Sequence, residues 1–160
     1  GAKTIGTDLV LVPIPKYARS TTTNGSGIRA LSSIEWDAYS VSLTSGAYDI
    51  GEACPSLPFT LLPNTSETLT LTVVPSTAYA LRVEVVDGSG NAIPYASVTL
   101  SRPGFSDTLT ASPCGQVFFN TGLTMASDYD LLVSATGYST KSVIGVNIDG
   151  QALQRVTLTP

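Results

Sequence analysis

The 160-residue chain has room for two small β domains, because a domain of about 80 residues still buries roughly 60% of the surface of its unfolded chain. Hydrophobic residues make up 42% and charged residues 12%, a balance that excludes a disordered chain. The net charge of −4 with eight scattered Lys and Arg residues excludes a basic nucleic-acid surface, and the lack of His excludes Ser-His-Asp and Cys-His catalysis.

The first half of the chain predicts short extended segments separated by turns, without helical periodicity over a full helix length. Its expected elements, in chain order, are a strand or loop over Leu9–Val12, a strand over Tyr17–Thr22, a turn over Thr23–Gly27, a central strand over Trp36–Leu43, an extended segment over Leu57–Leu61 and a strand over Thr68–Val74. Alternation places Tyr39 on the core side of the central strand and Trp36 on the exposed side. The Pro75–Thr77 linker then predicts a first domain over residues 1–75.

The second half, residues 76–160, predicts about seven strands, a number typical of a β-sandwich. The expected strands are Leu81–Val85, Ala96–Leu100, Asp107–Ala111, Val117–Phe119, Tyr129–Ala135, Val143–Ile148 and Val156–Leu158. The turn Asp87–Asn91 between the first two is rich in residues that tolerate a positive φ. We therefore expect an all-β chain of two tandem sandwich modules.

The two halves share a pattern, which indicates a repeat whose first copy begins late. Gly27–Val73 and Gly115–Leu158 each contain a Gly turn, a short apolar run, a strand opened by tyrosine, a Gly/Tyr corner and a Thr-rich closing strand. The first copy has no counterpart of Leu81–Asp87 or Ile93–Leu100. Two alternatives follow: another chain or an upstream segment completes the first module, or its own N-terminal segments rebuild the sheet.

The two cysteines, Cys54 and Cys114, are 60 residues apart and lie in polar segments beside prolines. They are either unrelated buried thiols or one disulfide of an exported protein. The polar, loop-like surroundings favour the disulfide, which would join the two modules. Two cysteines without a histidine do not supply the four ligands of a common zinc site, so no metal or other cofactor is expected.

Three segments of the second half carry a resemblance to a known family: Val83–Leu100, Gly115–Phe119 and Tyr129–Tyr138. On these residues the module resembles the carboxypeptidase regulatory-like (transthyretin-like) family, which includes the Cna protein B-type domains. The resemblance implies a seven-stranded Greek-key sandwich of immunoglobulin/transthyretin-like type, and it reaches the first module from about Thr21 onward. Such arrays look like the outer parts of bacterial surface and prepilin-type proteins, which implies an extracellular location without implying an activity.

Exposed aromatic residues are the candidate ligand contacts. Trp36 and Tyr17 are the proposed sugar-stacking side chains, with Tyr39 and Tyr48 as further members of such a platform. Core packing is the alternative interpretation for Tyr39, because alternation turns it inward.

Carboxylates offer weaker candidates. The pairs Glu35/Asp37 and Asp128/Asp130 have i, i+2 spacing, which indicates one solvated strand face, whereas glycosidase acids come from different strands of a cleft. Calcium ligands at Asp87, Asn91 or Asp149 are the other option, but calcium requires six to eight oxygens, and a side-chain-capped turn is the simpler interpretation.

The sequence thus favours a non-enzymatic structural or adhesive module pair of an exported bacterial surface or pilus-like protein. A carbohydrate-binding accessory module of a secreted enzyme is the alternative. The expected partners are neighbouring subunits or an upstream segment that completes the first module, and glycans. Nucleic acid is not expected as a partner, and neither is membrane contact, because no apolar stretch reaches about 18 residues. Gly1 is typical of a mature or trimmed fragment.

Overall fold

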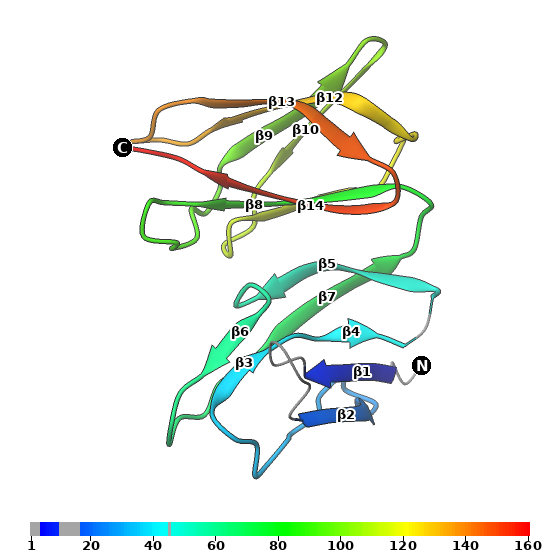
Figure 1. The fold of residues 1–160 in the computed structure, drawn as a ribbon, viewed down its shortest axis with the longest axis vertical. Coiled ribbons are helices and arrows are strands. Elements are labelled where there is room, and N and C mark those ends of the chain that lie inside the picture. Colours follow the sequence, from blue (N-terminus) through cyan, green and yellow to red (C-terminus); the bar gives the residue numbers. More distant parts are fainter. Residues whose placement is uncertain (1–3, 10–16, 45) are drawn as a thin grey trace. The chain divides into compact units, whose positions relative to one another are not determined.

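The structure is a computed structural model that describes residues 4–9, 17–44 and 46–160, with only the backbone described for residues 4–9 and 17. Its regular elements are strands, which confirms the all-β class (Figure 1). The chain divides into two compact units, Gly1–Ser76 and Thr77–Pro160. Among the described residues, no helix is long and apolar enough to cross a membrane.

The second unit contains seven strands in two sheets, as many strands as the sequence predicts. The strands are β8 (Ala80–Val86), β9 (Ser97–Arg102), β10 (Phe105–Thr110), β11 (Gln116–Phe119), β12 (Ala126–Ser134), β13 (Lys141–Ile148) and β14 (Gln151–Thr157). One sheet has the order β10-β9-β12-β13 and the other β11-β8-β14. The pair β8 and β14 is parallel, whereas the remaining ladders of this unit are antiparallel.

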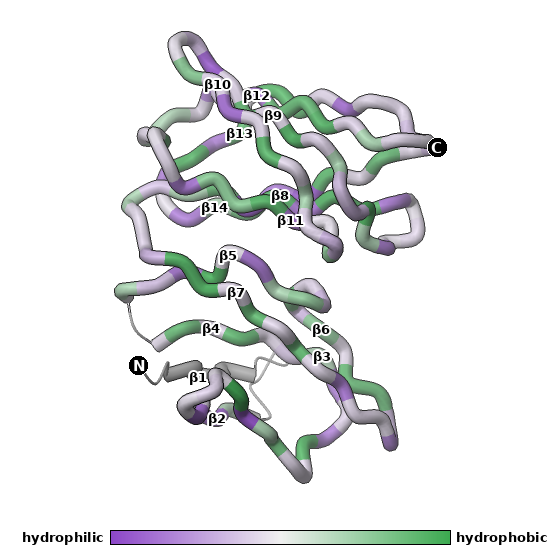
Figure 2. Tube along the Cα trace, turned by 180° about the vertical axis from the view of Figure 1, so that it is seen from behind, coloured by the Kyte–Doolittle hydropathy of each residue, from purple (hydrophilic) through white to green (hydrophobic). Residues whose placement is uncertain are grey.

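The core of the second unit forms because both sheets alternate apolar and polar residues with period two. Figure 2 shows apolar positions that recur along the strands, with hydrophilic positions between them and in the turns. The inward side chains belong to one buried cluster, which includes Leu81, Val83, Val85, Val98, Leu100, Val117, Phe119, Tyr129, Leu131, Val133, Val146, Ile148, Val156 and Leu158. Burial of each large apolar side chain contributes about 1.5–3 kcal/mol, so this cluster is the main source of the unit's stability.

The turn after β8 is capped by the side chain of Asp87. Its Oδ1 accepts the N–H groups of Ser89 and Asn91 at 2.8 and 2.9 Å, and its Oδ2 accepts the Asn91 amide at 2.9 Å. These hydrogen bonds, led by the one from the Asn91 side chain, lower the pKa of Asp87 below its ordinary value of 3.8. The carboxylate is therefore occupied as a turn cap, as the simpler sequence interpretation predicts.

The lowered pKa predicts an acid-sensitive turn. Because folding favours the charged carboxylate, the stabilisation from Asp87 is complete above pH 3.8 and is lost as the pH falls through the lower folded pKa. An NMR titration of the Asp87 carboxyl carbon should give a midpoint below 3.8 in the folded protein. The Asp87→Asn variant should show a flatter decline of stability as the pH falls below 3.8, and an unchanged decline would contradict the prediction.

The first unit also contains seven strands among its described residues, but they form three smaller sheets. The strands are β1 (Thr4–Leu9), β2 (Tyr17–Thr22), β3 (Asp37–Tyr39), β4 (Ser42–Leu43), β5 (Tyr48–Cys54), β6 (Phe59–Leu61) and β7 (Thr70–Pro75). The sheet orders are β2-β1-β4, β3-β6 and β5-β7. The turn predicted over Thr23–Gly27 is present, with the Asn24 Oδ1 accepting the N–H groups of Ser26 and Ile28, both at 3.0 Å.

Two sequence predictions for the first unit are wrong. The segment Trp36–Leu43 is not one strand, because β3 pairs with β6 whereas β4 pairs with β1, so the chain changes partner between them. The strand β5 was not expected, since a register shift between Ile50 and Glu52 interrupts its alternation. Cys54 consequently ends a strand and does not lie in a loop.

The predicted repeat does not extend to strand pairing. By the sequence match, β5 and β7 correspond to β13 and β14. In the second unit β13 and β14 belong to different sheets, whereas β5 and β7 pair with each other in an antiparallel ladder. The shared pattern reflects similar strand and turn chemistry, and it does not specify which strands become neighbours.

The described N-terminal strands rebuild a sheet of the first unit, which is one of the two alternatives from the sequence. The strand β1 pairs along its whole length with β2 and also pairs with β4. Of the segment Leu9–Val12, for which the sequence left strand and loop open, Leu9 falls in β1 and residues 10–12 lie outside the described residues. Among the side chains that the structure describes in this unit, Tyr39 and Ala53 are the buried hydrophobic ones.

Many other apolar side chains of the first unit are half-buried. They are Leu31, Ile34, Val41, Leu43, Ile50, Leu57, Phe59, Leu61, Leu69, Leu71, Val73 and Val74. The second unit, by contrast, encloses its apolar residues in one cluster. The two units therefore differ in core construction as well as in strand order.

Candidate functional site

The end of the β3–β6 ribbon presents an exposed apolar pair, Trp36 and Leu62. Trp36 directly precedes β3 and is 67% exposed, and Leu62 directly follows β6 and is 56% exposed. The ladder pairs Asp37 with Leu61, so its next position would place Trp36 opposite Leu62. Both residues lie one position beyond the last pair of the ladder, so this end of the ribbon carries two exposed apolar side chains.

Buried tyrosine anchors the segment that carries Trp36. The Tyr39 ring is 2% exposed and packs against Phe59 with ring centroids 5.9 Å apart. Its hydroxyl donates a hydrogen bond to the backbone carbonyl of Glu35, the residue before Trp36. This hydrogen bond fixes the backbone next to Trp36 to the buried Tyr39.

The segment that follows Leu62 forms a local turn. The N–H and the hydroxyl of Thr65 both donate to the Leu62 carbonyl, at 3.3 and 2.8 Å. A contact surface on a fixed backbone loses less conformational entropy when it binds a partner. The ribbon end is therefore suited to recognition by stacking and apolar contact.

The other predicted aromatic contacts do not join this surface in the described structure. Tyr39 is in the core, as alternation predicts, and the side chain of Tyr17 lies outside the described residues. Tyr48 is 44% exposed, but it opens β5 in a different sheet from β3. Leu62 was missed from the sequence because its position depends on the β3–β6 register.

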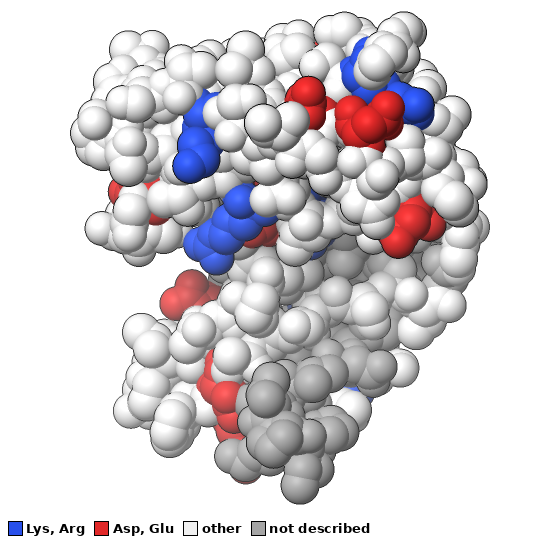
Figure 3. Space-filling view, turned by 45° about the horizontal axis from the view of Figure 1, so that its top comes forward, with Lys and Arg blue, Asp and Glu red and all other residues white. Residues whose placement is uncertain are grey.

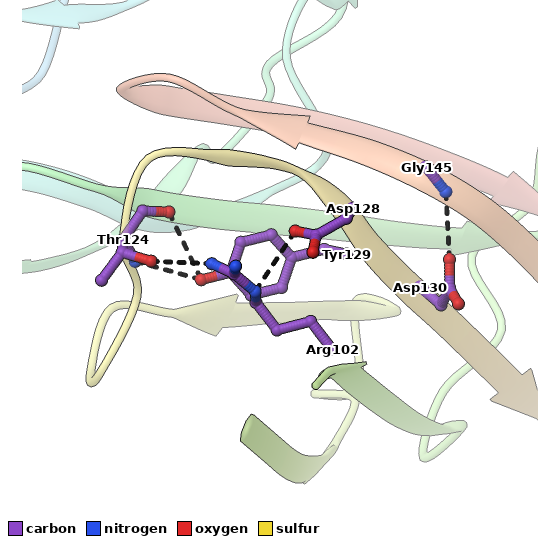
Figure 4. A network of polar contacts seen from close by, with 6 residues as sticks. All are labelled: Arg102, Thr124, Asp128, Tyr129, Asp130 and Gly145. Atoms are coloured by element: carbon purple, nitrogen blue, oxygen red, sulfur yellow. Dashed lines mark hydrogen bonds and ion pairs between the residues drawn. The ribbon is translucent and has the colours of Figure 1, made fainter. Parts of the chain in front are cut away.

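A polar cluster in the second unit is formed around Arg102 and Tyr129 (Figure 4). The Arg102 guanidinium lies 5.2 Å from the Tyr129 ring centroid and donates to the Thr124 hydroxyl at 2.9 Å. Its Nε is 3.2 Å from a carboxylate oxygen of Asp128, which makes an ion pair without hydrogen-bond alignment. Phe105 meets the same tyrosine ring edge-on at 5.8 Å.

Tyr129 is the centre of this cluster. Burial raises the pKa of its phenol, but hydrogen bonds with Thr124 and the positive charge of Arg102 outweigh burial and lower the pKa below 10.0. The Thr124 N–H donates to the phenol oxygen at 3.0 Å, and the phenol faces the Thr124 carbonyl at 3.3 Å. These bonds tie the approach to β12 to the core, which is a structural role.

Three of the carboxylates considered as catalytic or calcium-binding candidates have polar partners within the second unit. Asp128 pairs with Arg102, and Asp130 accepts the N–H of Gly145 at 3.0 Å in the neighbouring strand β13. Asp149 accepts the Asn147 amide at 3.1 Å. Among the described residues, no group of three or more His, Cys, Asp or Glu is placed to hold a metal ion.

Charged side chains are sparse on the surface. Figure 3 shows basic and acidic side chains singly and in small mixed groups, with broad uncharged areas between them on the visible face. This distribution matches the 12% of charged residues in the sequence. Contacts with a partner would accordingly depend on apolar and hydrogen-bonding groups.

Cys54 and Cys114 are both disulfide-bonded, and no cysteine is free in the part of the chain that the structure describes. Cys114 lies in a tight turn, in which the Gly115 N–H donates to the Ser112 carbonyl at 2.9 Å. Cys54 is the last residue of β5. The oxidised state is typical of proteins exported from the cytosol.

Comparison with known proteins gives distant structural neighbours. No family model and no curated protein matches the sequence. A putative carbohydrate binding protein from Bacteroides uniformis is 11% identical, with a TM-score of 0.42, over 51% of this chain and 41% of that one. The Bacillus anthracis TIE protein is 19% identical, with a TM-score of 0.41, over 62% and 20%. The pilus adhesin SpaC from Lactobacillus rhamnosus GG is 17% identical, with a TM-score of 0.36, over 99% and 29%.

The chain spans less than half the length of each of these three proteins. Their identities are all below 20% and their TM-scores below 0.5. The likeness therefore assigns neither a family nor a ligand to this chain, and the case for a function depends on its own residues.

Proposed function

We propose that the chain is a non-enzymatic structural and adhesive segment of an exported bacterial surface or pilus-like protein. The observation that carries the proposal is the exposed Trp36 next to β3, on a backbone that the buried Tyr39 holds through the Glu35 carbonyl. Tryptophan is enriched in the residues that dominate binding energy at protein interfaces. An exposed indole on a fixed backbone is suited to contact a partner surface.

Export is supported by the oxidised cysteines. We propose that Cys54 and Cys114 form one bond with each other, since the sequence has two cysteines in all. The resemblance of the second unit to carboxypeptidase regulatory-like modules agrees with a role outside the cell. On this proposal the protein is extracellular or attached to the bacterial surface.

The partners follow from the same features. The half-buried apolar residues of the first unit, including those of β7, favour contact with a neighbouring subunit or an upstream segment of the same protein. Glycans are the second class of partner, and the one that the alternative function requires, because sugars stack on exposed aromatic rings. Neither class requires a cofactor or a metal.

A carbohydrate-binding accessory module of a secreted enzyme is the second candidate. The exposed Trp36 favours it, since a flat indole ring suits the apolar face of a sugar. The two candidates differ in their ligand. A module of a polysaccharide-degrading enzyme binds one class of glycan, whereas a structural segment binds protein.

Replacement of Trp36 is the direct test. Trp36→Ala should weaken binding to any glycan or protein ligand at least about tenfold, the effect of losing a central aromatic contact. Its unfolding free energy should stay within about 0.5 kcal/mol of the original protein, because the ring is exposed. A glycan array and an assay of binding to intact bacterial cells supply the ligands.

Tyr95 provides the matched control, because it is also an aromatic residue with 67% exposure but lies in the second unit. Tyr95→Ala should bind as the original protein does. Saturable binding to one glycan class that requires Trp36 would support the accessory module. Binding to cells or protein that requires Trp36, with a flat glycan array, would support the structural segment. Equal binding by both variants would refute the role of the ribbon end.

A further inference from the structure

The first and last strands of the second unit are parallel neighbours. β8 is the first strand after the boundary between the units, and β14 is the last strand of the chain. Their register runs from Ala80 opposite Gln151 to Val86 opposite Thr157. Two further hydrogen bonds extend the ladder, from the Ala80 N–H to the Gly150 carbonyl at 3.0 Å and from the Leu158 N–H to the Val86 carbonyl at 2.9 Å.

This arrangement has a mechanical consequence. Because the strands are parallel, the start of β8 and the end of β14 lie at opposite ends of one ladder. Tension that enters before β8 and leaves after β14 pulls the strands along each other in opposite directions. The ladder bonds are then loaded together, whereas strands pulled apart from one end lose their bonds one after another. We propose that β8 and β14 form a clamp that bears tension along the chain when the bond proposed between Cys54 and Cys114 is reduced.

Side chains of the core strengthen the clamp. One buried cluster contains Leu81, Val83 and Val85 from β8. The same cluster contains Val156 from β14 and Leu158, which directly follows β14. Sliding of a strand by one residue would turn its inward side chains to the opposite face. Shear therefore exposes apolar surface at the same time as it breaks hydrogen bonds, which raises the barrier to forced unfolding.

The ladder between β8 and β14 also attaches β14 to the rest of its sheet. β8 lies in the middle of the order β11-β8-β14, and it is also paired with β11 through the antiparallel register of Glu84 with Gln116. β14 is the outer strand of this sheet. Release of β14 from β8 is accordingly the first step that we expect when the unit is pulled from its two ends.

The register distinguishes bonded from non-bonded residues of β14. Gly150 and Leu158 bond to β8 at the two ends of the ladder. In a parallel pair the bonded residues of one strand alternate, so Gln154 belongs to the bonded set, whereas the N–H of Arg155 faces away from β8. Proline at position 154 should remove a clamp bond, and proline at position 155 should not.

Single-molecule force spectroscopy of the full chain tests the clamp under reducing conditions, so that tension enters through the residues before β8. Pulling from the two chain ends shears the ladder. Pulling from the N-terminus and an attachment inserted at Asp149, before β14, opens the same ladder from one end. The first geometry should require the higher unfolding force, and equal forces would overturn the proposal.

The proline variants give a second readout in the end-to-end geometry. Gln154→Pro should unfold about fivefold faster or more than Arg155→Pro at the same force, since a net hydrogen bond contributes about 1 kcal/mol and forced unfolding follows the unfolding rate. Equal rates would contradict the clamp. If Gln154→Pro does not fold, the comparison of the two pulling geometries still tests the clamp, because that comparison leaves the sequence of both strands unchanged. The clamp does not depend on Trp36, so its failure and that of the proposed binding surface are separable.

Discussion

Gly115→Ala is expected to destabilise the second unit by about 2–5 kcal/mol, from a left-handed backbone cost of about 1–2 and an overpacking cost of about 1–3. Gly115 has a φ of +70°, and a Cβ there would lie 2.7 Å from the Val85 carbonyl oxygen and 3.1 Å from the Ile93 nitrogen. The Ile93 N–H donates to that same oxygen at 2.9 Å, and the Val85 N–H donates to the Gly115 carbonyl at 2.8 Å. The backbone therefore has little freedom to yield.

Gly137→Ala separates the two costs. Gly137 has a φ of +85°, and a Cβ added there would meet no atom within 4 Å, so its alanine variant has only the backbone cost of about 1–2 kcal/mol. Urea unfolding of both variants measures the difference in unfolding free energy. Equal losses for the two glycines would show that the close approach of Gly115 to β8 contributes nothing.

The second unit was largely predictable from sequence because its strands keep a regular period of two. Leu81, Val83 and Val85 alternate with polar or outward residues, and all three are buried as expected. The parallel pairing of β8 with β14 was not predictable in the same way. Alternation in a single strand specifies which face is buried, but the choice of neighbour depends on residues about 70 positions apart.

The first unit was less predictable for two local reasons. The register shift between Ile50 and Glu52 in β5 breaks the alternation, so this strand has no clear signature. The segment from Trp36 to Leu43 keeps a strand-like composition although it contributes to two different sheets. Composition reports the tendency to be extended, whereas pairing is decided by contacts between distant segments.

The candidate site was predictable in part. The parity of Trp36 relative to Tyr39 predicted an exposed indole and a buried phenol, and both exposures agree with the structure. Leu62 and the hydrogen bond from Tyr39 to the Glu35 carbonyl required the folded ribbon. The ligand-binding roles of Trp36 and Tyr17 stay predictions.

Reduction of the disulfide is expected to produce the largest mechanical change. A bond between Cys54 and Cys114 would close a loop of 60 residues, which contains β8, and tension would pass from one cysteine to the other without extending that loop. At 3.3–3.6 Å per extended residue, the loop contains about 200 Å of chain that the intact bond keeps from extending. In the chain-entropy description the same bond contributes on the order of 4 kcal/mol to stability.

The redox state would also decide whether the clamp is loaded. With the bond intact, tension reaches β14 from Cys114 and does not run along β8. After reduction it enters through the residues before β8 and shears the ladder. The Cys54→Ser variant should behave as the reduced protein without any reductant, which separates the bond from other effects of the reagent.

End-to-end extension of the full chain, measured by single-molecule pulling with and without reductant, tests most directly the account of a disulfide-linked, tension-bearing exported segment. The account predicts that reduction increases the maximum extension by about 200 Å and that Cys54→Ser has the longer extension under both conditions. The same maximum extension for oxidised, reduced and Cys54→Ser protein would contradict it.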